Sequence, residues 1–368
     1  MKNRTQKLLL QYGRILQQWL IPRLEEELGA LTEKHEQLVT VLGMLEIEKA
    51  VGCRAGMVGR PAHDRGTIAR AFVAKAVYNL GTTRALLDLL KTDTRLRRIC
   101  GWERQSEVPE EWVFSRAFAE FARTELPQRV HAALIAQTQK ERLIGHISRD
   151  ATAIAARERP VPKAEKVPAV VANGKKRRKR GEPKQPSEMT RIERQRTMTL
   201  AEMLADLPTD CAVGCKTNSH GRKETWRGYK LHLDVADGQI PISCWLTSAN
   251  LHDSQVAIPL ATMTAARVTS LYDLMDSAYD CVHIGEHSRG LGHVPIIEKL
   301  QRGAGRVPME PHRALRFDER TTVERVNSRL KDEFGGRHVR VRGYCKVMAH
   351  LMFGILVLSV DQILRLCT

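Results

Sequence analysis

Three acidic residues, far apart in the chain, have the type and setting needed to bind divalent metal ions. Asp150 follows the apolar run LIGHISR, Asp276 ends the run VTSLYDLM, and Glu324 lies in RFDERTTVERVNSRLKDEFGG, which predicts a helix. Mg²⁺ prefers a few carboxylates together with water and phosphate oxygens. Two such ions can activate the attacking oxygen of a phosphodiester reaction and stabilise the leaving oxygen. We therefore expect a phosphodiester-processing site wherever the fold brings these three carboxylates together.

Each acid also has an ordinary structural role open to it. Asp150 could end a strand at a turn, and Asp276 could cap the helix that follows it. Glu324 could form an exposed ion pair with Arg320, four residues earlier, which stabilises a helix by only a few tenths of a kcal/mol. Three further residues are weaker site candidates: His252, Asp253 and Asp280. For His252 and Asp253 the favoured role is capping of the following helix.

The helix that carries Glu324 presents cations on the same face. Arg320, Glu324, Asn327 and Lys331 recur at steps of three or four residues, which places them on one side of a helix. A glutamate between two cations suits metal binding with phosphates held on either side. Three more arginines follow in a strand-like or extended run and would continue a positive track along DNA: Arg337, Arg340 and Arg342.

The elements that must position these residues form a mixed α/β pattern. Residues 143–154 read as a strand, and residues 229–235 and 240–247 read as a hairpin around the turn Asp237-Gly238. A helix, a strand ending at Asp276, a short helix, the strand HVPIIEK and the Glu324 helix follow. Ligands of α/β sheets gather at the carboxyl ends of strands, where we expect Asp150 and Asp276 to lie.

The first 140 residues predict helices. Leucines from Leu24 to Leu45 keep a heptad-like 4-3 spacing after Pro22, which favours an amphipathic helix packed in its own domain over a dimeric coiled coil. Short helices then follow, with Gly81 ending one and Thr82 or Thr83 capping the next. Residues 54–149 hold 17 Lys and Arg against 10 Asp and Glu. This pattern suits a helix-turn-helix-like DNA-binding region, although a plain helical bundle is the alternative.

Charge and composition indicate a polyanion as the partner. The formal charge is +17 over 368 residues, which predicts attraction to nucleic acid. Residues 157–196 hold 14 Lys and Arg against 5 Asp and Glu and few large apolar side chains, which predicts a flexible insertion. Its densest basic run is either a solvated block or a phosphate-binding arm: Lys175, Lys176, Arg177, Arg178, Lys179 and Arg180.

The cysteines and apolar runs point to a cytoplasmic protein without a membrane span. The eight cysteines are scattered without zinc-finger spacing and predict reduced thiols. The N-terminus lacks the features of a signal peptide. The run LMFGILVLSV (residues 351–360) is about half a membrane span and predicts a buried C-terminal helix.

The residues around the three acids resemble those of bacterial insertion-sequence DDE transposases. The family signature Y-x2-R-x3-E-x6-K reads here as Phe317, Arg320, Glu324 and Lys331, with every spacing kept. MDSAYD is similar to the segment of the second catalytic aspartate, and ISRDATAI is similar to the strand of the first. GYKLHLDVADGQIP and TSANLHDSQ resemble the hairpin and next helix of the catalytic domain. GRPAHDRGTIARAFVAKAVYNL and LRRICGW resemble the family's N-terminal helical domain.

The resemblance implies an RNase H-like catalytic domain that binds two Mg²⁺ or Mn²⁺ ions through Asp150, Asp276 and Glu324. It implies cleavage of double-stranded DNA at terminal inverted repeats and strand transfer into target DNA. It does not cover the leucine stripe or the basic insertion. Phe317 departs from the usual tyrosine, because it keeps the ring but lacks the hydroxyl.

Joining two DNA ends requires two active sites, so we expect a homodimer on DNA, with the leucine stripe as one candidate interface. In a bacterial cell the protein would be associated with the nucleoid. The expected organisation is a helical segment (1–52), a helical DNA-binding domain (53–140), a catalytic domain (141–156 and 201–343), a basic insertion (157–200) and a C-terminal helix (344–368). Two alternatives are an RNase H-like nuclease that does not join DNA and a non-catalytic DNA-binding regulator.

Overall fold

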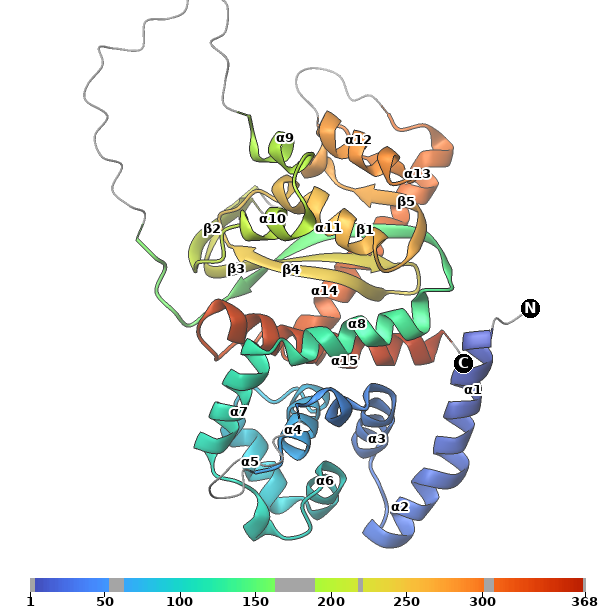
Figure 1. Cartoon of the computed structure of the whole chain (residues 1–368), viewed down its shortest axis with the longest axis vertical. Coiled ribbons are helices and arrows are strands. Elements are labelled where there is room, and N and C mark those ends of the chain that lie inside the picture. Colours follow the sequence, from blue (N-terminus) through green and yellow to red (C-terminus); the bar gives the residue numbers. More distant parts are fainter. Residues whose placement is uncertain (1–3, 53–62, 163–188, 218–220, 301–307, 367–368) are drawn as a thin grey trace, which may run out of the picture.

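A computed structural model of the chain describes residues 4–52, 63–162, 189–217, 221–300 and 308–366. A mixed β-sheet with helices on both faces makes up one half of the molecule, and helices from the N-terminal part of the chain make up the other (Figure 1). The long C-terminal helix runs between the two halves (Figure 1). This α/β arrangement with a helical N-terminal region is the one that the sequence predicts.

The sheet has the strand order of an RNase H-like fold. From one side to the other its main strands are β4, β3, β1, β5 and β6; β3 is antiparallel to β1 and β4, while β5 and β6 are parallel to β1. β2 pairs with the first part of β3. The strand bounds are β1 (Leu143–Ala155), β2 (Ala212–Thr217), β3 (Lys223–Ala236), β4 (Ile240–Ser248), β5 (Thr269–Met275) and β6 (Val294–Ile297).

The predicted hairpin is confirmed. Its turn needs left-handed backbone at Gly238 and Gln239, whose φ angles are +80° and +63°, and glycine adopts that region without steric penalty. β3 and β4 then pair from Tyr229 with Ser248 to Ala236 with Ile240. This register, with that of β1, fixes which side chains of β3 face each side of the sheet.

Helices cover the two faces of the sheet. α11 (Ser254–Ala265) packs against β3 and β4, and α12 (Val282–Gly290) contacts β6 and α11. On the opposite side α14 (Thr321–Glu333) contacts β1 and β3, and α15 (Tyr344–Arg365) contacts β4. α14 is preceded by α13 (Pro311–Phe317) and a 3-10 turn (Asp318–Arg320), so the stretch RFDERTTVERVNSRLKDEFGG enters its main helix through a tight turn.

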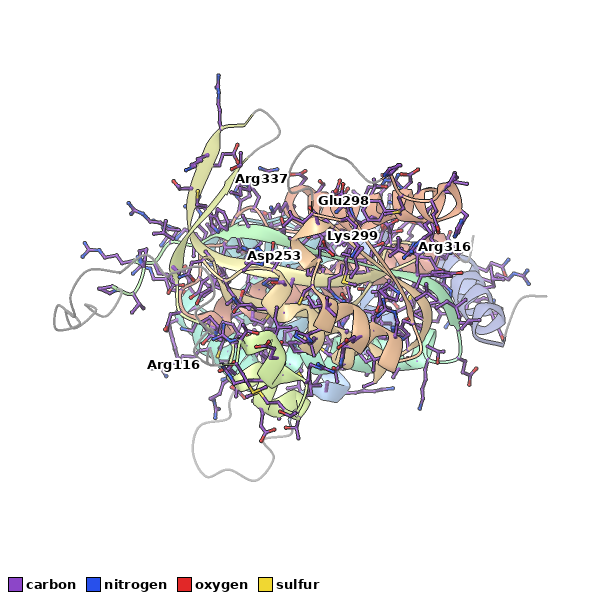
Figure 2. All side chains as sticks on the ribbon, turned by 90° about the horizontal axis from the view of Figure 1, so that it is seen from above. Arg116, Asp253, Glu298, Lys299, Arg316 and Arg337 are labelled. Atoms are coloured by element: carbon purple, nitrogen blue, oxygen red, sulfur yellow. The ribbon has the colours of Figure 1, made fainter. Side chains whose placement is uncertain are left out.

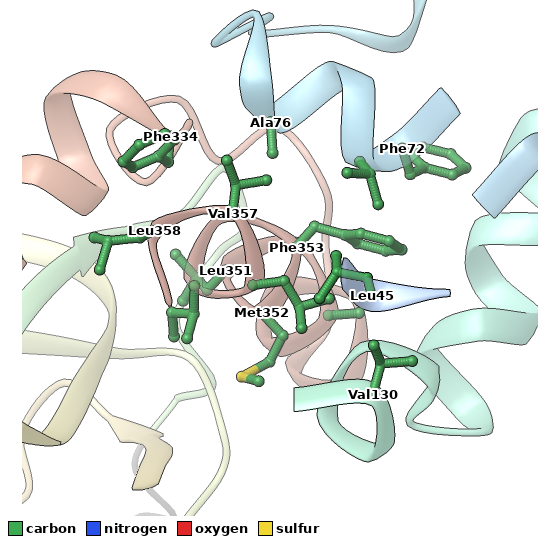
Figure 3. Close-up of a cluster of buried hydrophobic side chains, with 14 of the residues drawn as sticks. Leu45, Phe72, Ala76, Val130, Phe334, Leu351, Met352, Phe353, Val357 and Leu358 are labelled. Carbon is green, nitrogen blue, oxygen red and sulfur yellow. The ribbon is translucent and has the colours of Figure 1, made fainter. Parts of the chain in front are cut away.

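α15 is the centre of the hydrophobic core. It contacts α3, α4, α7, α8, α14 and β4, and most of its side chains are buried. Among the described residues it is the one helix long and apolar enough to cross a membrane, but most of its apolar stretch is buried inside the protein. The expected buried C-terminal helix is thus confirmed, and Figure 3 shows Met352, Phe353 and Val357 of this helix inside the core.

The N-terminal helices share this core. One continuous cluster of buried apolar side chains runs from Leu38 through Phe72 and Val130 to the sheet and Ile363. The helices concerned are α3 (Glu33–Leu45), α4 (Arg65–Val77), α5 (Thr83–Thr92), α6 (Thr94–Cys100), α7 (Glu111–Arg123) and α8 (Leu126–Gln139). α8 even bonds to the sheet, because His131 Nε2 lies 3.1 Å from the Pro241 carbonyl. The described helices α4 to α8 therefore share one hydrophobic core with the sheet.

The leucine stripe is not one continuous helix. α1 (Arg4–Ile15), a π-helical turn (Leu16–Leu20) and α2 (Ile21–Leu28) end at Gly29, whose φ is +77°. α3 starts afresh with Thr32 as its N-cap, which accepts from the His35 amide. Leu38, Leu42 and Leu45 are buried inside the same chain, so this part of the stripe is packed within its own fold and cannot form a dimer interface.

Four smaller features of the sequence can also be compared with the structure: a helix cap, the insertion, the cysteines and the basic run. Thr82 caps α5 by accepting from the Ala85 amide. The segment expected to be a flexible insertion is helical at its end, where α9 (Arg191–Gln195) packs on α11 and leads to α10 (Leu200–Ala205). The six cysteines within the described residues are free thiols. The basic run from Lys175 to Arg180 lies outside the described residues.

Candidate active site

Strand pairing brings the two predicted aspartates side by side. The last parallel pair between β1 and β5 is Arg149 with Met275, so Asp150 and Asp276 follow directly on neighbouring strands. Asp276 leaves the sheet at this point, as expected. Asp150 does not, because β1 continues to Ala155 along its antiparallel partner β3. The strand predicted over residues 143–154 is confirmed, but Asp150 lies within it and not at its end. Only the parallel pairing with β5 ends at this point.

The environment of this pair disfavours two bare negative charges. Burial raises the pKa of Asp150 to about 7, and the charge of Asp276 adds to the shift while Arg320 opposes it. Burial likewise raises the pKa of Asp276, although one of its oxygens accepts from the Ala278 amide at 2.9 Å and caps the following turn. Two partly desolvated carboxylates of this kind ionise readily only when a cation compensates them.

α14 lies against the strand that carries Asp150. Asn327 Nδ2 donates to Asp150 Oδ2 over 3.2 Å, and one turn later Lys331 Nζ donates to Thr152 Oγ1 over 2.6 Å. Asp150 and Thr152 are two residues apart and share one face of the strand. The predicted polar face of the helix therefore does point at the site.

Glu324 does not join the two aspartates in this structure. Its carboxylate accepts from the Arg320 guanidinium at 2.8 Å, and about half of its side chain is exposed. It lies on α14 one turn before Asn327. Within the described part of the chain, no three His, Cys, Asp or Glu side chains are clustered closely enough to hold a metal ion. The helix thus carries Glu324 towards the site, while its side chain adopts the ion pair that the sequence left open.

Phe317 has a defined role beside this pair. The Arg320 guanidinium carbon lies 5.7 Å from the centroid of the Phe317 ring, within the range of a cation–π contact. The ring alone makes this contact. The absence of a tyrosine hydroxyl therefore leaves the placement of Arg320 intact.

A second ion pair stands next to the aspartates. Lys230 Nζ lies 2.7 Å from Asp253 Oδ1 and also donates to the Leu251 carbonyl. The charge of Asp253 raises the pKa of both Asp150 and Asp276. Asp253 occupies the N-cap position of α11 but makes no capping bond, so its predicted capping role is wrong. Lys230 was missed, because an exposed-looking lysine on an alternating strand carries no signal of its distant partner.

The other weak candidates are occupied elsewhere. His252 Nδ1 interacts with the hydroxyl and amide of Ser254 at the start of α11, as predicted for a cap. Asp280 binds Lys299 Nζ at 2.9 Å and the Leu300 amide at 3.0 Å.

Positive charge surrounds the helix. Burial lowers the pKa of Lys331, and the nearby charges of Lys216 and Arg337 lower it further, so cations from α14, β2 and the following loop lie close together. Arg337, which is labelled in Figure 2, is exposed. It pairs with Asp332. Arg340 and Arg342 are also exposed, and they lie in an irregular segment, which corrects the strand-like alternative.

The donors present fit a hard divalent cation. The two half-buried carboxylates offer only oxygen ligands, which suits Mg²⁺ or Mn²⁺ and does not suit a softer metal such as zinc. Burial is the main cause of the raised pKa of both carboxyl groups, and Arg320 opposes it only in part. Glu324 could add a third carboxylate only after leaving Arg320.

Two family models match this chain. The model described as Transposase DDE domain matches residues 210–360, and the model described as Transposase domain (DUF772) matches residues 26–120. The first match includes Asp276 and Glu324 but starts after Asp150. Comparisons with curated proteins and with solved structures gave no significant match.

The sheet order and the helical region agree with an RNase H-like domain joined to a helical region. Together with the two matched domains, they support an insertion-sequence DDE transposase.

Proposed function

We propose that this transposase cleaves DNA at the terminal inverted repeats of its element and joins the freed 3′-OH to target DNA. The observation that carries the proposal is the pairing of Asp150 and Asp276 on adjacent strands beneath a helix that also bears Glu324. Two divalent ions, when bound, supply the charge that activates the attacking oxygen and stabilises the leaving oxygen.

Each residue of the proposed site has a separate task. Asp150, Asp276 and Glu324 would hold the ions, and Asn327 would orient the Asp150 carboxylate through the bond that it already makes. Arg320 and Lys331 would bind phosphates on either side of the scissile bond. Release of Arg320 from Glu324 would then serve both metal binding and phosphate binding.

The remaining surface would recognise the DNA. Helices α5 to α7 would read base edges in the major groove, and Arg337 with Lys175 to Arg180 would add affinity that does not depend on sequence. Because two ends must be joined, the protein would act as a dimer on DNA. Its interface must lie outside Leu38, Leu42 and Leu45, which are buried within one chain.

Replacement of Glu324 by glutamine tests the assignment of the third carboxylate. We expect Glu324→Gln to slow Mg²⁺-dependent cleavage of end-containing DNA by at least about 100-fold, because a neutral amide is a poor ligand for Mg²⁺. Asp318→Asn is the matched control, since Asp318 is an exposed acid just before the same helix. Equal cleavage by Glu324→Gln and wild type would show that Glu324 is not a ligand.

A strand-transfer assay with the same DNA distinguishes the other functions. Joined products indicate the proposed transposase. Cleavage without joining indicates an RNase H-like nuclease, and binding without cleavage indicates a regulator. Mn²⁺ should support the same products as Mg²⁺, because both ions accept octahedral oxygen ligands.

A further inference from the structure

A cavity of about 460 Å³ lies outside the carboxylate site, between the helical region and the segment that follows α14. Its walls come from α4, α7, residues 334–342 and α15. We call it the basic cavity, after the four cations that line it: Lys75, Arg340, Arg342 and Lys346. This volume falls within the range of small-molecule sites in proteins.

The innermost of these cations has no partner. Lys75 retains only 8% of its accessible surface, and its ammonium makes no hydrogen bond or ion pair within the described residues. The other buried cations of the described segments are compensated: Arg149 is held by Asp234, and Arg97 donates to backbone carbonyls. An unpaired buried ammonium is costly, and burial lowers the pKa of Lys75 to about 8.

The rim of the cavity is also uncompensated. Arg340, Arg342 and Lys346 are exposed and form no ion pair within the described part of the chain. The one acid in the lining is Glu111, whose carboxylate lies 3.4 Å from Arg84. Four cations around one acid leave an excess of positive charge directed at a single opening, which suits an anion such as a phosphate group.

The inner wall of the cavity is aromatic. The Phe353 ring lies 5.7 Å from that of Phe72 and 6.2 Å from that of Phe118, and Phe334 completes this wall. Figure 3 shows Phe72, Phe334 and Phe353 around the same stretch of α15. A ligand that combines a phosphate with an apolar, stackable group matches both parts of the lining.

We infer that the basic cavity binds one nucleotide of a DNA strand, with its phosphate against the four cations and its sugar and base against the phenylalanines. The inference rests on the proposed function in that DNA is the substrate. Phe334 caps the C-terminal end of α14 and follows Glu324 by ten residues, so this part of the cavity wall lies roughly 15 Å along the helix from Glu324. That separation corresponds to about four base-pair steps of duplex.

An unpaired nucleotide reaches such a cavity without the cost of unstacking a base. We therefore compare two DNAs of equal charge: an end duplex with a short single-stranded extension, and a blunt duplex. The full-length protein should bind the first about tenfold more tightly, because one desolvated charge-assisted contact contributes about that much. Fluorescence anisotropy with labelled DNA at constant salt measures the ratio. Lys75→Met should reduce it to about one, while Lys140→Gln, an exposed cation at the end of α8, should leave it unchanged.

Measurements of thermal stability distinguish DNA binding by Lys75 from a purely structural role of this residue. Without DNA, Lys75→Met should raise Tm at pH 7, because it removes a buried unpaired charge and keeps the volume of the side chain. The gain should shrink between pH 8 and 10, since wild type is stabilised there as its folded state releases the Lys75 proton before the unfolded state does. A lower Tm in Lys75→Met together with an unchanged DNA preference would overturn the inference.

Two further experiments separate the cavity from catalysis and identify the source of the phosphate. Glu324→Gln should keep the preference for the extension, so a failure of catalysis does not count against the cavity. Inorganic phosphate and dAMP should compete only weakly with the extended DNA. One combination of results would contradict the assignment to DNA. In it, phosphate or dAMP raises the Tm of wild type but not that of Lys75→Met, and wild type binds the two DNAs equally. The cavity would then be a site for a free anion.

Discussion

Asn327 is the residue that ties the helix of the signature to the first aspartate. Its amide nitrogen donates to Asp150 Oδ2, and its amide oxygen is buried without a partner among the described residues. A ligand carboxylate held by a second side chain is oriented before the metal arrives. In the proposed site, Asn327 would therefore act through Asp150, as a positioning residue.

Removal of this contact should affect catalysis more than folding. We expect Asn327→Ala to lower the cleavage rate about tenfold, within the range for loss of a group that supports a metal ligand. The Mg²⁺ concentration for half-maximal cleavage should rise in parallel, which a purely structural residue would not cause. A rate and Mg²⁺ dependence equal to those of wild type would refute the role.

At the scale of elements, the approach of α15 to the end of α14 depends on a glycine. A Cβ at Gly354 would lie 2.4 Å from the Phe334 carbonyl oxygen and 2.9 Å from a Leu330 methyl carbon. Both neighbours are themselves buried. The two helices could accommodate the added methyl group only by moving apart.

Substitution of this glycine should therefore destabilise the fold. We expect Gly354→Ala to lower the free energy of unfolding by about 1–3 kcal/mol through overpacking. Gly290→Ala is the control, because a Cβ there meets nothing within 4 Å, and a helical alanine should be neutral or slightly stabilising. Thermal unfolding of both variants checks the contrast; equal Tm values would show that the helices can separate freely.

The leucine stripe shows how an element can be misjudged from spacing alone. Its period is correct for a helix, and its C-terminal half does bury leucines in α3. Gly29 and the Thr32 cap nevertheless divide it, because a glycine at positive φ and a capping box stabilise a break more than the stripe stabilises continuity. Substitution of Leu38, which is fully buried, would test stability and not dimerisation.

At the scale of the molecule, one core joins the N-terminal helices to the sheet through α15. If the helices bind DNA as proposed, their binding energy can hold the DNA at the carboxylates, because the shared core leaves no gap in packing between the two parts. The charge of +17 acts on the same partner over a longer range. The attraction due to net charge does not depend on the base sequence.

The basic insertion should contribute mainly through counterion release. Deletion of residues 175–180 removes six positive charges, and the slope of log affinity against log salt should fall by up to about 5. Deletion of residues 167–172, which are uncharged and of equal length, should leave the slope unchanged. Binding isotherms at several salt concentrations test this, and an unaltered slope in the first variant would exclude a phosphate-binding role.

The sequence by itself determined the local elements and the chemistry that they carry. Strand alternation, the Asp237-Gly238 turn and the apolar C-terminal run depend on neighbouring residues, and for this reason they were predictable. The identities of Asp150, Asp276 and Glu324 and the spacing from Phe317 to Lys331 were readable in the same way.

Only the tertiary structure decided which of these groups meet. The register between β1 and β5 sets Asp150 beside Asp276, although 126 residues separate them in the chain. Helix packing brings Asn327 into contact with Asp150. It also places Lys75 in the wall of the basic cavity, without a partner among the described residues. Glu324 is held by Arg320, because an exposed carboxylate pairs with the nearest cation until a stronger charge competes for it. Contacts of this kind depend on residues distant in sequence, whose approach no local pattern encodes.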